Sequence, residues 1–271
     1  MLVMLAPSFD GSDDAYARLV KATGMLAYDL KSRLKPGVWG VVRALADLGQ
    51  AQQLLDRLLA ENLPALIVPR EVAHDPDRRI VTIRALDLGS DHLVIHLRER
   101  EMSVPFGALS CIVRGEVHTG QVPNRTGAPS SATFRAAAPS TSDIQMFRES
   151  VSVSNFEAYS AADLHFATVL WVARIDARSF DFSALGLVSE SPASDLDQLV
   201  EVLSERSGVR VDRGVRASSV VSTLTQGGGS SRSSGTLQAV RSKEASDERF
   251  DPYSRVIGEA ERLLAQARKV A

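Results

Sequence analysis

Histidine is the residue type through which this chain could most readily bind a metal ion. The five histidines lie at positions 74, 92, 96, 118 and 165. The best-spaced pair, His92 and His96, falls on one face of a predicted strand, which sets their backbones roughly 13 Å apart. Two imidazoles on one zinc ion need ring nitrogens within about 4 Å of each other. The sequence therefore predicts solvent-facing histidines and no metal site.

Acid–base chemistry would need carboxylates placed beside a histidine. Asp176, Asp181 and Glu190 bracket a predicted passage from strand to helix, and His165 precedes them. Phe180-Asp181-Phe182-Ser183, however, is typical of a strand end with core aromatics and a turn. We predict no catalytic residues, and the alternative is an enzyme with a dispersed active site near His165, Asp176 and Asp181.

Phosphate binding by a glycine-rich loop is not indicated either. The stretch Gly227-Gly228-Gly229-Ser230-Ser231-Arg232-Ser233-Ser234-Gly235 is followed by Thr236-Leu237, whereas a P-loop needs lysine and then serine or threonine after its last glycine. We therefore predict no cofactor. The single cysteine, Cys111, excludes a disulfide within the chain and is predicted to be a buried thiol.

Arginines are the residues that could bind nucleic acid, but their setting disfavours it. They are Arg98 and Arg100 in one predicted hairpin, and Arg206, Arg210, Arg213 and Arg216 around the exit of the predicted helix. Arg98 and Arg100 alternate with Glu99 and Glu101, and phosphate binding needs unopposed positive charge. The formal net charge of -2 gives no bulk attraction to nucleic acid or anionic lipid. A weak nucleic-acid-binding protein remains only an alternative.

Composition favours a soluble globular protein, with 44% hydrophobic and 24% charged residues. The apolar run Ala167 to Ala173 falls far short of the roughly 20 residues that span a bilayer. Met1 to Ala6 lacks the basic segment and the length of a secretory signal. We expect a cytoplasmic protein that does not enter a membrane.

Residues 1–70 predict a small βααβαβ sandwich. The expected elements are a strand over 2–6, helices over 12–23 and 26–34, a strand over 38–44, a helix over 48–62 and a strand over 65–68. Ser12 is a helix cap and Gly24 ends the first helix, because a hydroxyl satisfies exposed N–H groups and glycine accepts a left-handed conformation. We expect helices on one face of the sheet.

This element order resembles the C-terminal domain of the bacterial ribosomal stalk protein over Leu2 to Val68. The bend between the two helices, Lys21-Ala22-Thr23-Gly24-Met25, and Tyr28-Asp29-Leu30-Lys31 after it, carry the resemblance. The resemblance implies that the surface around the bend binds translation factors. Of the family's three basic residues, Lys31 matches one, while the other two fall on Ala17 and Val20.

Residues 79–213 predict an antiparallel β-rich domain interrupted by a flexible insert over 118–142. Strands are expected around 80–85, 92–97, 110–117, 164–172 and 174–182, with a hairpin turn at 89–91. A helix that starts at Ser191-Pro192 and buries Leu196, Leu199, Val200 and Leu203 would cap one end. Several antiparallel strands and one helix form the pattern of a pleckstrin-homology-like barrel, so the fold class is α+β.

Residues 214–249 predict a disordered linker, and residues 250–270 predict an amphipathic helix. Its apolar stripe must be buried on the chain's own domains, on another copy, or on a different protein. We expect a non-enzymatic protein-interaction or scaffold module that binds a protein partner, or self-associates, through this helix. The residues expected to bind a partner are Tyr253, Val256, Ile257, Leu263, Leu264 and Lys31.

Overall fold

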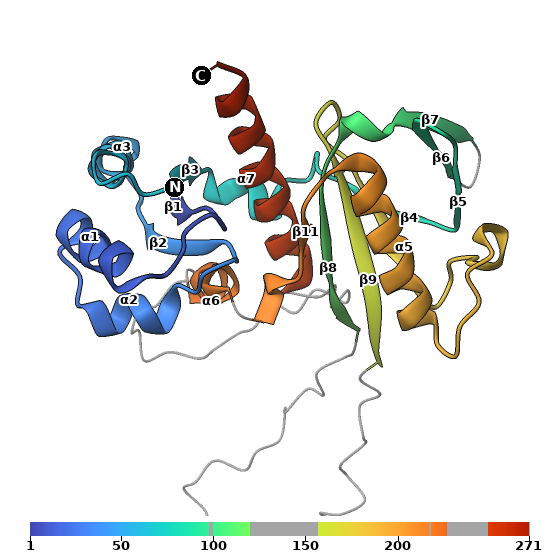
Figure 1. Ribbon diagram of the computed structural model, residues 1–271, viewed down its shortest axis with the longest axis horizontal. Helices are drawn as coiled ribbons and strands as arrows, with labels where there is room; N and C mark the ends of the chain where they lie inside the picture. The colour runs from blue at the N-terminus through green and yellow to red at the C-terminus, as the bar shows by residue number, and fades with distance from the viewer. Residues whose placement is uncertain (98–99, 120–156, 217, 227–248, 271) are drawn as a thin grey trace, which may run out of the picture.

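The computed structural model describes residues 1–97, 100–119, 157–216, 218–226 and 249–270. It has the predicted α+β class, with several sheets and a C-terminal helix. Two units lie side by side, an N-terminal αβ unit and a β-rich unit, and the C-terminal helix stands between them (Figure 1).

The N-terminal unit has the predicted βααβαβ order. Its elements are β1 (Leu2–Leu5), α1 (Asp13–Thr23), α2 (Ala27–Arg33), β2 (Gly40–Ala44), α3 (Leu48–Ala60) and β3 (Ala65–Val68). The sheet order is β2-β1-β3, with antiparallel pairing throughout. Ser12 caps α1 by accepting a hydrogen bond from Ala15 N at 3.1 Å, and Gly24 ends it at φ 68°. These local signals act as predicted.

Both faces of this small sheet are covered, not one as predicted. Val3, Leu5 and Val42 pack under the three helices. Leu2 and Met4 point to the opposite face, where they pack against the C-terminal part of the chain. The physical reason is visible in β1, whose uninterrupted apolar run suits a strand buried on both faces.

The β-rich unit contains two sheets and one helix around a shared core. Its strands are β4 (Ile80–Ile83), β5 (Ala85–Leu88), β6 (His92–His96), β7 (Glu101–Pro105), β8 (Leu109–Thr119), β9 (Glu157–Phe166), β10 (Val172–Asp176) and β11 (Val211–Asp212). The sheet orders are β11-β8-β9-β10-β4 and β5-β6-β7. The core lies between these sheets and helix α5 (Pro192–Ser207), and includes Ile95, Leu164 and Leu199. The pleckstrin-homology-like shape stays a prediction.

Several details of the unit differ from expectation. β4 pairs with β10, and β11 with β8, in parallel rather than antiparallel fashion. β7 was not predicted, because its apolar residues Met102 and Val104 are only half-buried at a sheet edge. β9 begins at Glu157, well before the predicted start, whereas the hairpin between β5 and β6 forms as predicted.

The predicted linker over 214–249 is partly wrong. Residues 214–216 form the short 3-10 helix η4 (Gly214–Arg216), and α6 (Ser219–Gln226) follows. Val220 and Leu224, one helical turn apart, are buried, and Ser219 Oγ accepts a hydrogen bond from Val41 N at the edge of β2. Residues 227–248 lie outside the described part of the chain. Within the predicted insert, residues 118 and 119 belong to β8 and residues 120–142 are likewise not described.

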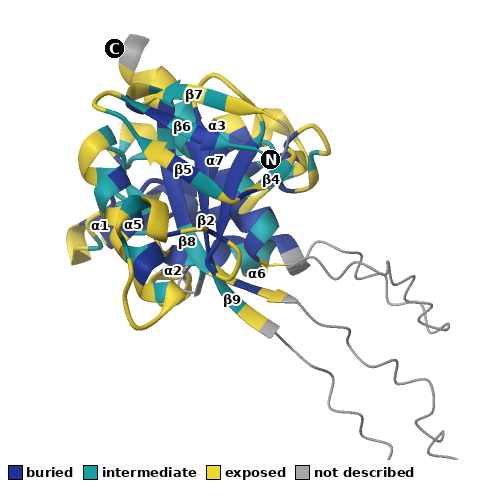
Figure 2. Ribbon diagram, turned by 90° about the vertical axis from the view of Figure 1, so that its right-hand side faces the viewer, coloured by how far each residue is buried: buried dark blue, intermediate teal, exposed yellow. Residues whose placement is uncertain are grey.

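The C-terminal helix α7 (Phe250–Val270) packs within its own chain. It lies against β3 and the short 3-10 helix η1 (Arg70–His74) on one side and against β8 and β9 on the other (Figure 1). Figure 2 shows α7 among the buried elements in the middle of the molecule, while its C-terminal end is exposed. The sequence left three locations open for the apolar stripe of α7, and in the structure the stripe is buried on the chain's own domains.

Candidate functional site

A cluster of polar residues lies where α7 covers the sheet of the β-rich unit. Asp163 and His165 on β9 point to this face because they are two residues apart. Arg174 of β10 is the register partner of Asp163, and Cys111 of β8 is the partner of His165, so both share the face. Among the described residues, this cluster has the types and proximity that catalysis would need.

The centre of the cluster is a buried ion pair. Arg174 Nε and Nη2 donate to the two carboxylate oxygens of Asp163 at 2.7 and 2.8 Å, and Nη1 lies 2.8 Å from Asp251 Oδ1 of α7. Burial by itself lowers the pKa of Arg174, but the two carboxylates outweigh it and raise the pKa above its usual value. The guanidinium thus joins α7 to the sheet as a permanent cation.

Ser254 of α7 links the ion pair to His165. Its Oγ donates to Asp163 Oδ2 at 2.6 Å and lies 2.9 Å from His165 Nε2. Because a hydroxyl has one proton and an ionised carboxylate only accepts, the serine must accept its second bond from the Nε2–H of the imidazole. Burial lowers the pKa of His165 to about 4, so the ring is neutral at pH 7.

This serine, histidine and aspartate do not form a nucleophilic triad. In such a triad the imidazole accepts the hydroxyl proton, whereas here the carboxylate does. Ser254 and Asp163 are also fully buried, which leaves no approach for a substrate. The arrangement positions a helix and does not activate a nucleophile.

Glycines let α7 come this close. A Cβ on Gly258 would clash with the ring of His165, and a Cβ on Gly115 of β8 would clash with the ring of Phe250. A Cβ on Gly214 would meet the hydroxyl of Tyr253 at 2.8 Å. The contacting surfaces are therefore matched in shape to this helix.

Three further polar contacts hold α7 in register. Tyr253 Oη donates to the buried Asp212 at 2.5 Å. Arg78 Nη2 donates to Glu259 Oε2 at 2.6 Å.

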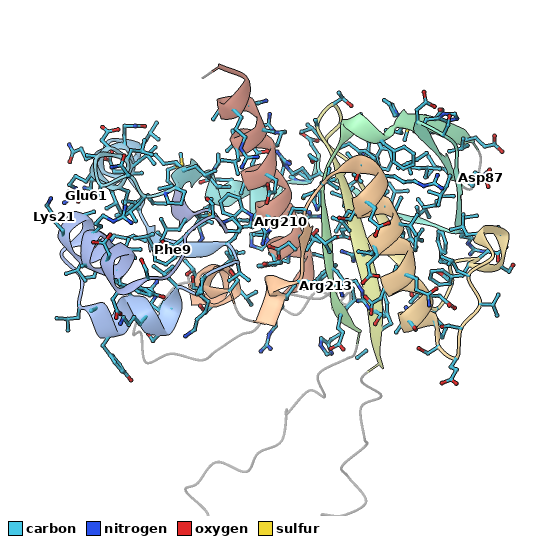
Figure 3. All side chains as sticks on the ribbon, viewed as in Figure 1. Phe9, Lys21, Glu61, Asp87, Arg210 and Arg213 are labelled. Carbon is cyan, nitrogen blue, oxygen red and sulfur yellow. The ribbon has the colours of Figure 1, made fainter. Side chains whose placement is uncertain are left out.

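Glu261 Oε1 makes the third contact, because it accepts hydrogen bonds from Trp39 Nε1 at 2.9 Å and from Arg210 Nη1 at 3.1 Å. Arg210 is labelled beside α7 in Figure 3. Trp39 belongs to the N-terminal unit and Arg210 precedes β11, so α7 is tied to both units.

The strand register separates His165 from Asp176, two residues of the alternative active site. Asp176 lies opposite Ala161, four residues along β9 from His165, which corresponds to roughly 13 Å. Asp176 accepts instead from Arg178 Nη2 at 2.8 Å. Asp181 is exposed and accepts from Ser183 Oγ at 2.6 Å. The sequence could not place these groups, and the structure does not bring them together.

The two strand histidines form hydrogen bonds with nearby carboxylates. His92 Nδ1 lies 2.9 Å from Asp91 Oδ1. His96 Nε2 lies 2.8 Å from Asp87 Oδ2, and its Nδ1 lies 3.2 Å from Glu101 Oε1. The hydrogen bond to Asp87 raises the pKa of His96. Asp87 is labelled at the far end of the β-rich unit in Figure 3. Within the described ranges no group of three or more His, Cys, Asp or Glu side chains is arranged so that it could hold a metal ion.

The central residues of the α7 stripe, which the sequence predicted to bind a partner, are covered by the chain itself. Tyr253, Val256 and Ile257 are fully buried within the chain, because the sheet faces of both units meet them. Leu263 and Leu264 are half-buried against the same core.

Lys31, the remaining predicted residue, is exposed on α2. Its Nζ donates to Asp13 at 2.7 Å and lies 5.3 Å from the centre of the Tyr16 ring. Lys21 Nζ similarly lies 2.6 Å from Glu61 Oε1. Lys21 and Glu61 are labelled at the outer edge of the N-terminal unit in Figure 3. The positive charges of Lys21 and Lys31 are thus each paired with a neighbouring carboxylate.

The turn between α1 and α2 exposes two large apolar side chains that sequence reasoning missed. Leu26 is 72% exposed and Tyr28 is 81% exposed. We call residues Gly24–Asp29, of which all but the half-buried Met25 are exposed, the bend surface. The sequence signal for this exposure was the short length of α2, which buries Leu30 and leaves the residues before Leu30 in the helix exposed.

Arginines that could have bound nucleic acid are engaged in the structure. Arg206 donates to Gly89 O at 2.9 Å, and Arg213, below α7 in Figure 3, donates to Asp197 at 3.1 Å. Their partners and the ion pairs of Arg210 leave no unopposed positive patch formed by these three residues.

Comparisons of the chain with protein-family models, curated proteins and solved structures give no match. In the described part of the chain, every helix is too short or too polar to cross a membrane.

Proposed function

We propose that this protein is a non-enzymatic protein-interaction module whose partner binds the bend surface. The observation that carries the proposal is the exposure of Leu26 and Tyr28, which are two residues apart at one turn. Isolated exposed apolar residues are ordinary, whereas two that are close in sequence at a fixed turn can anchor a partner. Val169 and Leu170 form another such pair, but each is less exposed than Leu26 and Tyr28.

The bend surface is held in a defined shape, which lowers the entropic cost of binding. Thr23 Oγ1 donates to Leu19 O at 2.7 Å and accepts from Met25 N at 3.2 Å. Gly24 turns the chain in the left-handed conformation. The two anchors are therefore presented on a turn that is fixed by its own hydrogen bonds.

The charges around the bend favour an apolar partner. The ion pairs of Lys21 with Glu61 and of Lys31 with Asp13 leave no net charge on those residues. Binding should then depend on burial of Leu26 and Tyr28 and respond weakly to salt. The resemblance to the stalk-protein domain, whose bend region binds translation factors, supports the same location.

The proposal includes a cytoplasmic location. Cys111, the single cysteine of the sequence, is a free and buried thiol. Small proteins of oxidising compartments commonly carry paired cysteines. The unpaired thiol therefore supports a reducing compartment.

The test is capture of binding proteins from the native host by the full chain and by a Leu26→Ser/Tyr28→Ser double variant. Both changes lie on exposed side chains, so the fold should be retained, and circular dichroism checks this. Val188→Ser is the matched control, because Val188 is an 80% exposed apolar residue elsewhere on the molecule. We expect partners to be retained by wild type and control but lost by the double variant.

Equal capture by all three proteins would contradict the bend surface as the binding site. A shift of oligomeric state in sedimentation, abolished only by the double variant, would identify the partner as a second copy of the chain.

A further inference from the structure

Helix α7 joins the two units of the protein. One side of it packs on β3 and η1, and the other side packs on β8 and β9 (Figure 1). A single apolar cluster accordingly contains Met4 of the N-terminal unit, Val113 of the β-rich unit and Ile257 of α7. If α7 moved away, apolar surface on both units would be exposed at once.

His165 of β9 lies directly against the face of α7 that covers the β-rich unit. It is buried, it donates to Ser254 of α7, and its ring contacts Gly258 one helical turn further on. The neutral ring fits the site. A second proton would place a positive charge in a closed space between the helix and the sheet, where desolvation disfavours charge.

The charged groups around His165 are already committed to one another. On the sheet, Asp163 is paired with Arg174. On α7, Asp251 is paired with Arg174, and Glu259 with Arg78.

The other titratable groups on the elements that face His165 supply no free negative charge for a protonated ring. The thiol of Cys111 lies across from His165 on β8, and burial raises its pKa well above the usual value. Asp212 of β11 is bonded to Tyr253 and paired with Arg210. No described carboxylate near the ring is left without a cation or a donor, so a protonated His165 would have no counter-ion of its own.

We propose that α7 is an acid-sensitive latch that opens when His165 gains a proton. In the open state the imidazole is solvated and titrates at its ordinary value of 6.5, whereas burial lowers the pKa to about 4 in the closed state. The stabilisation of the closed state is therefore complete above pH 6.5 and is lost as the pH falls toward 4. The protonation of His165 by itself should make the opening equilibrium about 30-fold larger at pH 5 than at pH 7.5.

Asp251 contributes in the opposite direction. Burial raises its pKa, so its protonation favours the closed state as the pH falls. A variant of His165 alone separates the two effects, because it leaves Asp251 in place.

Cys111 supplies a built-in probe of opening. It is the single thiol of the sequence and lies in the cluster covered by α7. A disulfide reagent that remains reactive in acid, 4,4′-dithiodipyridine, should label it only when α7 is displaced. Labelling rates from pH 7.5 to 4.5 are divided by those of the urea-unfolded chain at the same pH, which removes the intrinsic dependence of the thiol.

We expect the corrected labelling rate of the wild type, divided by that of His165→Gln at the same pH, to rise about 30-fold between pH 7.5 and 5. In His165→Gln, whose amide can still donate to Ser254, the rise should disappear. His96→Gln, which removes a half-buried histidine that lies away from α7 on β6, is the control and should keep the rise. His165→Asn replaces His165→Gln if circular dichroism shows that the glutamine variant is not folded.

Two results would overturn the latch. The first is a labelling rate of the wild type that does not rise relative to that of the folded His165 variant. The second is loss of the circular dichroism signal of the whole chain at the pH where labelling rises, because that would be global unfolding.

Discussion

Gly258 of α7 lies against the ring of His165 of β9, at a distance that a methyl group would not permit. The glycine is in the middle of a long helix, where it costs about 1 kcal/mol relative to alanine. Its presence there is explained by the close approach of helix and sheet.

Gly258→Ala should destabilise the protein. Helix propensity alone predicts a gain of about 1 kcal/mol, but overpacking against a ring and a helix backbone typically costs about 1–3 kcal/mol. We expect a lower midpoint in urea denaturation. Gly107→Ala is the control, since a Cβ there meets nothing within 4 Å. A more stable Gly258→Ala variant would show that the helix does not sit on His165.

Ile257→Ala should cost about 2–5 kcal/mol of unfolding free energy, the usual range for removing a buried aliphatic side chain. Ile257 is fully buried, whereas Leu26 is largely exposed. Leu26→Ala should therefore stay within about 0.5 kcal/mol of the wild type. Urea denaturation of both variants measures this difference. If the apolar stripe of α7 did not stabilise the folded chain, Ile257→Ala would cost as little unfolding free energy as Leu26→Ala.

Arg174→Ala should destabilise strongly, by about 3–5 kcal/mol, because it leaves the buried Asp163 without its cation. Arg213→Ala is the comparison, since Arg213 forms its ion pairs at the surface and should contribute less than about 1 kcal/mol. Thermal or urea denaturation at pH 7 measures both. Similar losses in the two variants would mean that the Arg174 site is more open to water than the structure has it.

His96 should titrate above 6.5, in the direction opposite to His165. Its hydrogen bond to Asp87 and the nearby Glu101 favour the protonated ring, so its pKa is raised. The stabilisation is present below pH 6.5 and is lost as the pH rises through the raised pKa. Proton NMR titration of the His96 ring checks this. Asp87→Asn should return the midpoint toward 6.5, and an unchanged midpoint would contradict the role of that hydrogen bond.

Local elements were predictable because their causes are local. Ser12 and Gly24 bound α1 by hydrogen bonding and backbone geometry within a few residues. The alternation of His92 to His96 defined β6 in the same way. The stripe of α7 was also legible, since helix periodicity depends on nearby residues.

The location where that stripe is buried was not predictable, because the residues that contact α7 come from distant parts of the chain. Asp212, Trp39 and His165 are far from α7 in the sequence and contact it in the folded structure. The sequence did carry hints, in the uninterrupted apolar run Leu2–Leu5 and in Gly258 within the helix. Neither hint identifies a contact by itself.

The sequence alone determined the βααβαβ unit, the strand alternation that follows it and an amphipathic C-terminal helix, since propensity, capping and periodicity act over short range. Only the tertiary structure decided that this helix closes its own chain, that His165 and Ser254 meet under it, and that Leu26 and Tyr28 stay exposed. Burial and charge pairing are properties of surfaces brought together from distant positions, and they arise only when the chain is packed.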